Sequence, residues 1–346
     1  MTANDRYVVV GAGHGGKAMA AHLALMGCEV TLYNRTAAHT AAMHSRGGIY
    51  LVSEDPGCPQ GFGKLQTITS DMSEALAGGD VIMVVVPATA HHDVARAAAP
   101  HLRDGQIVVL NPGRTGGAIE FVRVLGEQGC TADVTVAEAA TLIYASRAEG
   151  PAQARIYRIK DAVPLAALPA PRTPQVLAAL QPAYPQFIDG QTVLHTSLDN
   201  MGAIFHPALT LLNAGRIEST HGDYEFYMDG VTASVARVLE TLDRERVTVA
   251  AALGIRATTA TEWLRLAYDA SGSDLNEAIH SNPGYQGIKA PPNLEHRYIT
   301  EDVPMSLVPI GSLGQRCGVS VRGMDSIVRL ACIIHQTDYW RRGRTL

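Results

Sequence analysis

The segment from residue 11 to residue 16 carries glycines at the first, third and sixth places of a G-x-G-x-x-G pattern. A β-branched run precedes it and an alanine-rich stretch of helical composition follows it. In this setting the three glycines allow a tight turn, a close approach of pyrophosphate to the backbone, and close packing of helix on strand. Free N–H groups at the helix start would then hold the phosphates. The pattern predicts a dinucleotide site rather than a turn that binds nothing, formed by Gly11, Gly13, His14, Gly15 and Gly16.

The residues after the second expected strand bear on which dinucleotide binds. An NAD site usually has Asp or Glu there, whose carboxylate accepts hydrogen bonds from the ribose hydroxyls. This chain has Asn34, Arg35 and Thr36 instead. Arg35 can pair with the 2′-phosphate of NADP, which a carboxylate would repel, and Asn34 and Thr36 can donate hydrogen bonds. We therefore expect NADP, and the alternative is NAD held by other contacts beside a solvated Arg35.

Two further apolar strands are expected to end in residues that stop regular pairing. Val86 and Pro87 end one strand, and Asn111 and Gly113 flank a proline at the end of another. Ligands of doubly wound sheets bind outside the carboxyl ends of the strands. We expect both ends to contribute to the cofactor site, and the alternative is a pair of ordinary proline-containing turns.

A histidine in the second half of the chain is a candidate acid/base. His206 lies in an otherwise apolar helical segment, and Pro207 beside it removes a backbone donor and favours a kink. An imidazole in such a place can transfer protons, although a core histidine bonded to backbone is the alternative. Glu301 and Asp302 form the polar cluster that could orient the ring, and spacing alone does not pair either with His206.

Two kinds of scaffold would position these residues. The first half of the chain alternates strand and helix, whereas the second half is helical in texture. The expected fold is α/β, with an N-terminal Rossmann domain containing a doubly wound sheet over residues 1–190 and an all-helical C-terminal domain over 191–346. The segments 48–52 and 64–68 are expected to form a hairpin. A long helix is expected at 231–253, either as the seam of a homodimer or as domain core.

Composition excludes several classes of function. A net charge of −5 over 346 residues argues against a nucleic-acid surface. No apolar run approaches the ~20 residues that span a bilayer, so no membrane association is expected. The five cysteines are scattered without a C-x-x-C pair, which is typical of reduced thiols in a cytoplasmic protein. His91 and His92 are expected in a loop rather than at a metal site, and no metal is expected.

Further motifs occur in a fixed order along the chain. They are Val85–Ala88, Leu110–Gly113, His195–Asn200, His206–Pro207, Leu211–Asn213, Phe226–Thr232, Arg297–Tyr298, Glu301–Val303 and Leu307–Pro309. With the glycine loop, they resemble the octopine/nopaline-type opine dehydrogenases over essentially the whole chain, and most closely the N-(1-D-carboxyethyl)-L-norvaline dehydrogenase branch. The resemblance implies an NAD(P)-dependent oxidoreductase of CH–NH groups, which joins the amine of an amino acid to an α-keto acid and reduces the imine. It also implies that His206 and Asp302 carry the proton chemistry, with Asp302 setting the tautomer of the ring.

Two positions depart from that branch. Asn34 stands where the branch has an acidic residue, which supports NADP over NAD. Gly202 stands where the branch has Asn, one helical turn before His206 and therefore on the same face. The missing amide opens space beside the expected substrate, so the accepted imine is expected to differ from the usual opine precursor. Asn200 lies nearby and is a second candidate for contact with the substrate.

The leading interpretation is an NADPH-dependent opine dehydrogenase. The nearest alternative keeps the His–Asp machinery as an imine reductase or reductive aminase that acts on other amines or carbonyls. A β-hydroxyacid-type dehydrogenase usually relies on a lysine in its helical half, and beyond residue 160 this chain has only Lys289, in a Pro/Gly-rich segment. A dinucleotide sensor without activity is a third alternative, disfavoured by the presence of both His206 and Asp302.

Overall fold

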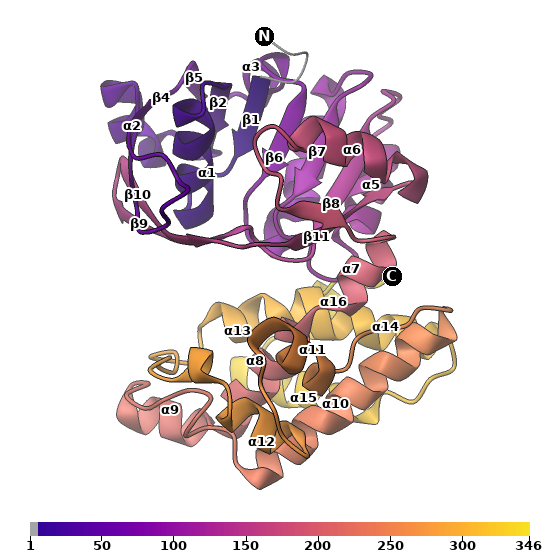
Figure 1. Cartoon of the computed structure of the whole chain (residues 1–346). Helices are drawn as coiled ribbons and strands as arrows, with labels where there is room; N and C mark the ends of the chain where they lie inside the picture. The colour runs from indigo at the N-terminus through magenta and orange to yellow at the C-terminus, as the bar shows by residue number, and fades with distance from the viewer. Residues whose placement is uncertain (1–5) are drawn as a thin grey trace. The chain divides into compact units, whose positions relative to one another are not determined.

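The computed structural model describes residues 6–346, which form two compact units. One unit ends at Thr196 and the other begins at Ser197, so the boundary falls inside helix α7 (Val193–Leu198) (Figure 1). The boundary expected from the sequence lies after residue 190.

Eight strands form the main sheet of the first unit, in the order β12-β11-β8-β7-β6-β1-β2-β5. The strands from β8 to β5 run parallel, β11 pairs antiparallel with β8, and β12 pairs parallel with β11. The predicted doubly wound fold is confirmed, with a strand of opposite direction near one edge. The strands are β1 (Arg6–Val10), β2 (Glu29–Tyr33), β5 (Thr67–Thr69), β6 (Val81–Val84), β7 (Ile107–Leu110), β8 (Thr135–Ala139), β11 (Val163–Leu168) and β12 (Phe187–Asp189).

Both faces of this sheet are buried, and β1 shows the alternation that this requires. Tyr7 and Val9 belong to one apolar core, and Val8 and Val10 to another. Helices α3, α4 and α5 contribute to the core that holds Val8, while α1 and α6 contribute to the core that holds Tyr7. These helices are α1 (His14–Leu25), α3 (Met72–Ala77), α4 (His91–Ala98), α5 (Gly117–Glu127) and α6 (Thr173–Leu180).

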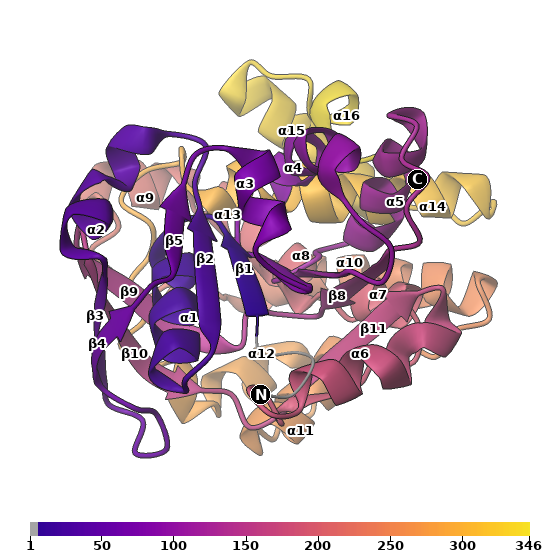
Figure 2. The ribbon, with the colours of Figure 1, turned by 90° about the horizontal axis from the view of Figure 1, so that it is seen from above.

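A second sheet of four strands, in the order β4-β3-β10-β9, belongs to the same unit. Helix α1 contacts strands of both sheets and lies between them (Figure 2). Its residues from Gly16 to Leu23 are all buried, which explains why the helix is apolar around its whole circumference. The strands of this sheet are β3 (Gly48–Ser53), β4 (Gly61–Lys64), β9 (Tyr144–Gly150) and β10 (Gln153–Ile159).

The structure corrects two sequence predictions in this unit. The first strand of the expected hairpin pairs with β4, but the segment 64–68 is not one strand, because the chain leaves the small sheet there. Leu65 N donates to Gly47 O, Gln66 N donates to Val30 O, and β5 then pairs with β2 in the main sheet. His91 and His92 lie in α4 rather than in a loop, because the one-turn helix after Pro87 leads directly into α4.

The second unit is helical, which confirms the predicted all-helical C-terminal domain. Helix α8 contacts α10, α13, α15 and the π-helix η6, so it is central to the packing of this unit. Its helices are α8 (Met201–Leu212), α9 (Ala214–Thr220), α10 (Ala233–Ala252), α11 (Ala260–Tyr268), α12 (Leu275–His280), α13 (Arg297–Thr300), η6 (Val303–Leu307), α14 (Val308–Arg316), α15 (Arg322–His335) and α16 (Tyr339–Arg342). The remaining short helices of the chain are α2 (Ala41–Arg46), η1 (Ala37–His39), η2 (Ala88–Ala90), η3 (Ala99–His101), η4 (Ala170–Arg172) and η5 (Pro283–Tyr285).

A buried arginine on α10 fixes the segment that leads into α8. The Arg246 side chain is fully buried and pairs with Asp243, one turn earlier on α10. It also donates hydrogen bonds to the carbonyl oxygens of Leu198 and Thr258. Because a buried charge is tolerated only when it is paired and hydrogen-bonded, this arrangement holds α10 to the starts of α8 and α11. The interior of α10 therefore serves as domain core, one of the two roles considered for it.

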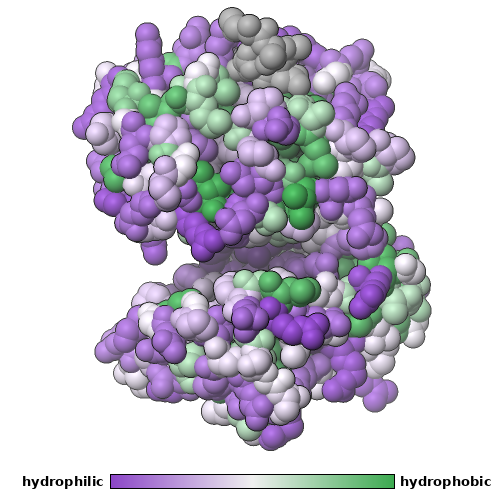
Figure 3. Space-filling model, in the orientation of Figure 1, coloured by the Kyte–Doolittle hydropathy of each residue, from purple (hydrophilic) through white to green (hydrophobic). Residues whose placement is uncertain are grey.

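Surface and composition add three observations. Within residues 6–346, no helix combines the length and apolarity needed to cross a membrane. The five cysteines are free thiols. Hydrophilic side chains cover most of the visible face of each unit, with hydrophobic ones in smaller groups between them (Figure 3).

A buried polar chain joins α1 to the strands around it. His22 Nδ1 and the Tyr144 hydroxyl are 2.9 Å apart, and that hydroxyl donates to the hydroxyl of Tyr184 at 2.7 Å. Burial lowers the pKa of His22 to about 4, with Asp55 opposing the effect. Burial also raises the pKa of both tyrosines. The three groups are therefore neutral in the folded protein near pH 7, and they anchor α1 to the segments that carry Tyr144 and Tyr184.

We predict that His22 makes stability depend on pH below neutrality. Between the ordinary pKa of 6.5 and about 4, the unfolded chain binds a proton at this position that the folded protein excludes. The free energy of unfolding should therefore fall as pH falls through this window, by up to about 3 kcal/mol from this group. Denaturant unfolding at a series of pH values should show a smaller fall in His22→Gln, while His44→Gln on exposed α2 should follow the wild type. A His22→Gln protein with the full wild-type slope would contradict this assignment.

Candidate active site

The glycine loop between β1 and α1 has the geometry that its pattern predicts. Gly11 has φ +113°, and a Cβ there would lie 2.4 Å from the carbonyl oxygen of Val85. A Cβ at Gly16 would lie 1.8 Å from the carbonyl oxygen of Gly11, so the helix start packs against the strand end without room for a side chain. A Cβ at Gly13, the N-cap of α1, would meet nothing within 4 Å. The space above Gly13 is open to a ligand. The N–H groups in the first turn of α1 point out of the N-terminal end of the helix.

His14 and Gly15 connect the loop to β9 and to the segment before it. His14 Nδ1 accepts a hydrogen bond from Ala148 N at 2.8 Å, and a Cβ at Gly15 would lie 2.8 Å from Leu142 Cδ2. Lys17 Nζ donates to the carbonyl oxygen of Gly150 at 3.1 Å. The small sheet therefore supports the loop from one side.

The end of β2 lies beside the same loop. Asn34 Oδ1 accepts from Ala12 N at 3.2 Å, and Asn34 Nδ2 donates to the carbonyl oxygen of Thr36 at 3.0 Å. An Asp at this position could accept the first bond but could not donate the second. Arg35 is largely exposed, and Asp93 of α4 approaches its guanidinium to 3.8 Å. The structure thus ties Asn34 to the glycine loop and to Thr36, and it leaves the cationic Arg35 side chain exposed to solvent.

The ends of β6 and β7 are shaped by close packing. Val85 follows β6 and contacts Gly11, as described above, and Pro87 is the N-cap of η2. Asn111 is buried after β7, and its Nδ2 donates to the carbonyl oxygen of Val109. A Cβ at Gly113 would lie 2.5 Å from Glu138 Oε2.

Glu138 is a buried carboxylate that the sequence analysis missed. Its Oε2 accepts from Ala118 N in the first turn of α5, and its Oε1 accepts from the hydroxyl of Thr196 on α7. It therefore joins β8 to the start of α5 and to α7. Its position between Ala137 and Ala139, as a single acidic residue in an apolar strand, is the feature of the sequence that could have indicated its importance.

Lys160 is a second residue that the sequence analysis missed. Burial, with Arg114 as a second cause, lowers its pKa to about 8. Its Nζ donates to the Thr141 hydroxyl at 2.7 Å, and its main-chain N donates to the carbonyl oxygen of Ile143. Lys160 thus holds the segment after β8 against the end of β10.

In the second unit, the structure brings His206 and Asp302 together. His206 lies within α8, and Asp302 lies between α13 and η6. Asp302 Oδ2 is 2.8 Å from His206 Nδ1; the carboxylate is fully buried, and 21% of the His206 side chain is exposed. Because an ionised carboxylate only accepts hydrogen bonds, we assign the proton to Nδ1, which leaves Nε2 as the nitrogen that can react.

Glu301, the other acid considered for His206, has a different partner. Its Oε2 accepts from Arg297 Nη2 at 2.7 Å, one turn earlier along α13. The two adjacent acids therefore bind different side chains, and the geometry pairs His206 with Asp302.

The two candidate substrate residues lie at the start of α8. Asn200 is its N-cap residue and is buried, and its Nδ2 donates to the Ser306 hydroxyl on η6 at 2.9 Å. Gly202 is partly exposed and one turn before His206 on the same helix.

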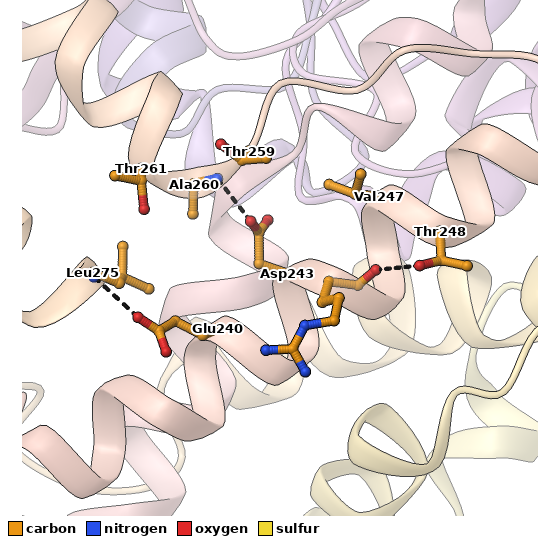
Figure 4. Close-up of a pocket in the computed structure, with 9 residues that line it drawn as sticks. Glu240, Asp243, Val247, Thr248, Thr259, Ala260, Thr261 and Leu275 are labelled. Carbon is orange, nitrogen blue, oxygen red and sulfur yellow. Dashed lines mark hydrogen bonds between the residues drawn. The ribbon is translucent and has the colours of Figure 1, made fainter. Parts of the chain in front are cut away.

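A hollow of about 310 Å³ lies elsewhere in the second unit, between α10, α11 and α12 (Figure 4). Asp243 accepts there from Ala260 N, and Glu240 accepts from Leu275 N. Both carboxylates thus bind the starts of neighbouring helices, and neither His206 nor Asp302 lines this hollow.

Comparison with known proteins gives a separate match for each half of the chain. Residues 190–335 match a family model described as the alpha-helical domain of NAD/NADP octopine/nopaline dehydrogenase, and residues 6–113 match the NAD binding domain of 6-phosphogluconate dehydrogenase. The opine dehydrogenase of Arthrobacter sp. (strain 1C) is 38% identical over 346 residues, which cover 100% of this chain and 95% of the relative. Protein ocs of Agrobacterium tumefaciens (strain Ach5) is 27% identical over 308 residues, or 88% of this chain and 83% of that protein.

Solved structures share the fold. Octopine dehydrogenase with NADH and L-arginine superposes with a TM-score of 0.82 at 22% identity, over 95% of this chain and 89% of that one. Yersinopine dehydrogenase with NADP+ superposes with a TM-score of 0.78 at 15% identity, over 98% of this chain and 92% of that one. With a Rossmann unit and a helical unit, and with these relatives, the chain is an NAD(P)-dependent oxidoreductase. More specifically, the chain belongs to the opine dehydrogenase family, whose members act on the CH–NH group of donors.

Substitutions at two glycines of the loop should affect different properties, the stability of the fold and the affinity for dinucleotide. Gly16→Ala should destabilise the fold by roughly 3–5 kcal/mol, because its methyl group would overlap the Gly11 carbonyl. Gly13→Ala should change stability by less than about 1 kcal/mol but raise the dissociation constant for dinucleotide about 10-fold or more, because its methyl group would project into the open space above the loop. Denaturant unfolding and fluorescence titration with NADPH and NADH would measure both quantities.

Gly126→Ala is the matched control, since a Cβ at Gly126 of α5 would also meet nothing within 4 Å. It should bind dinucleotide as the wild type does. A Gly13→Ala protein with wild-type affinity would mean that the phosphates do not approach this part of the loop.

Proposed function

We propose that this protein is an NADPH-dependent opine dehydrogenase, which condenses an amino acid with an α-keto acid and reduces the resulting imine. The observation that carries this proposal is the buried Asp302 carboxylate on Nδ1 of a partly exposed His206, in a chain of the opine dehydrogenase family. The net reaction consumes one amino acid, one keto acid, one NADPH and one proton. It yields the secondary amine, NADP+ and water.

His206 and Asp302 are proposed to move the protons of this reaction. A charged His206 can donate Nε2–H to the hydroxyl group that leaves the carbinolamine, and the Asp302 carboxylate compensates the charge of the ring. In the reverse direction a neutral Nε2 can accept a proton from water that attacks the imine. When bound, the nicotinamide supplies the hydride that reduces the C=N bond.

For the cofactor we propose NADPH, bound by the residues predicted from sequence. The open space above Gly13 and the N–H groups of the first turn of α1 fit a pyrophosphate, with Gly11, His14, Gly15 and Gly16 shaping the loop. The exposed Arg35 fits the 2′-phosphate, and no acidic residue stands at position 34 to repel it. The ends of β6 and β7, with Val86, Pro87, Asn111 and Gly113, complete the proposed site. Octopine dehydrogenase with NADH and yersinopine dehydrogenase with NADP+ illustrate both cofactor types on this fold, so NAD is the alternative.

For the substrates we propose that α8 contributes Gly202 and Asn200. Gly202 lies on the His206 face of the helix, and its missing side chain leaves room for the substituents of the imine. The bond from Asn200 to Ser306 fixes the orientation of its amide at the start of the same helix. A glycine inside a helix costs about 1 kcal/mol relative to better helix formers, which favours a specific use of the space. Domain limits at residues 190 and 191, a homodimer and a cytoplasmic location remain predictions from the sequence.

The direct test is to follow NADPH oxidation with pyruvate and a panel of amino acids, omitting each component in turn. Oxidation should require all three, and mass spectrometry should detect an opine that contains the carbon skeletons of both substrates. Rapid oxidation without any amine would contradict the proposal and indicate a hydroxyacid dehydrogenase. Equal or faster turnover of amines without a carboxylate would favour the alternative function, a reductive aminase or imine reductase.

Arg35→Ala tests the cofactor assignment. Loss of a charge-assisted hydrogen bond worth about 1.5–3 kcal/mol should raise the dissociation constant for NADPH by roughly 10–100-fold and leave NADH nearly unchanged. Asp93→Asn should instead tighten NADPH binding, because it removes an anion that competes with the phosphate for Arg35. Arg46→Ala on exposed α2 is the matched control and should change neither affinity. Equal losses for NADPH and NADH in Arg35→Ala would rule out this role.

A further inference from the structure

The imidazole of His206 lies flat against the ring of Tyr298. The two ring centroids are 4.1 Å apart and the planes are inclined by 20°. Tyr298 in turn stacks on Phe226 at 5.2 Å and 23°, and the ring of His296 meets it edge-on at 4.3 Å and 78°. The imidazole therefore ends a stack of three aromatic rings.

This stack rests on the interior of the second unit. Phe226 is fully buried, and its main-chain N donates to the carbonyl oxygen of Ile288. Tyr298 lies on α13, which is capped by His296 Nδ1 accepting from Tyr298 N. Tyr298 and Asp302 are four residues apart, the separation that brings two side chains to one side of a helical segment. One short segment thus supplies both the Asp302 carboxylate and the Tyr298 ring, which contact the His206 imidazole.

The two contacts restrict different motions of the imidazole. The bond from Nδ1 to Asp302 fixes one atom of the ring and its tautomer, but the ring can still swing about that bond. A flat ring against its face prevents this swing, because aromatic neighbours at this distance are in van der Waals contact. With both contacts in place, the direction of Nε2 is determined.

We propose that Tyr298 is a positioning residue for His206, which acts through the face of its ring and directs Nε2 toward the reacting atoms. This inference rests on the proposed function of His206. The hydroxyl group of Tyr298 has no part in this role, so phenylalanine should replace it.

Kinetics of three variants test the proposal. Tyr298→Leu should lower kcat by roughly 10–100-fold, the effect expected when a catalytic group loses its alignment, with the KM values changed by less than a few-fold. Tyr298→Phe should retain near-wild-type kcat. Tyr285→Leu removes a stacked tyrosine that contacts Tyr227 rather than His206, and it should leave kcat nearly unchanged. Dinucleotide titration should give wild-type affinity for all three. If Tyr298→Leu fails to fold, Tyr298→Met replaces the ring with a flexible apolar side chain.

An independent measurement separates this inference from the proposed function. Long-range ¹H–¹⁵N spectra of the imidazole nitrogens, with the His206 signals assigned from a His206→Gln variant, report the tautomer and order of the ring without turnover. The wild type and Tyr298→Phe should show one ordered ring with an Nδ1–H tautomer, whereas Tyr298→Leu should keep this tautomer but show signals broadened by motion of the ring. A wild type that is inactive with every substrate but shows this pattern would refute the function and support the positioning role. Unchanged kcat and spectra in Tyr298→Leu, or equal losses in Tyr298→Phe, would overturn the inference.

Discussion

The bond between His206 Nδ1 and the buried Asp302 carboxylate is the constraint on which the second unit depends. A carboxylate without exposure to water must be paired, because leaving it unpaired costs several kcal/mol. The pairing requires α8 to stay against the junction of α13 and η6, and the bond between Asn200 and Ser306 ties the start of α8 to the same π-helix. Arg246 donates to the carbonyl oxygen of Leu198 and so fixes the segment that leads into α8. The proposed role of His206 in proton transfer would explain why these polar groups lie deep in an apolar domain.

In the first unit the corresponding constraint is the approach of α1 to β1. The contact of Gly16 with the Gly11 carbonyl excludes any side chain, and α1 is then enclosed between two sheets. Enclosure on all sides explains its apolar sequence, and the bond of His22 to Tyr144 satisfies a polar group that the enclosure buries. At the start of this helix, by contrast, the space above Gly13 is open. The elements that stabilise this unit are therefore those that shape its proposed dinucleotide site.

The sequence predicted the parts of the fold that depend on local patterns. The glycine loop, the parallel strands around it, the helical second half and the long helix α10 follow from periodicity and from glycine and proline positions. The four-stranded sheet was missed because β3 pairs with β10, about a hundred residues later in the chain, and no local pattern encodes such a pairing. Glu138 and Lys160 were missed because their importance comes from burial, which a single polar letter in a sequence does not reveal. His206 was singled out by its apolar surroundings, but its pairing with Asp302 rather than Glu301 needed the family resemblance, since adjacent acids have the same spacing. The stack on Tyr298 depends on the fold of three separate segments.

The central claim is that His206 and Asp302 act as one unit, and a double-mutant cycle on kcat tests it most directly. His206→Ala and Asp302→Asn should each lower kcat by roughly 10²–10⁴, and the double variant should be little worse than either, because residues that act together are not additive. Glu301→Gln, at the neighbouring acid bonded to Arg297, should retain most of the wild-type kcat. Multiplicative losses in the double variant, or near-normal turnover in Asp302→Asn, would contradict the account.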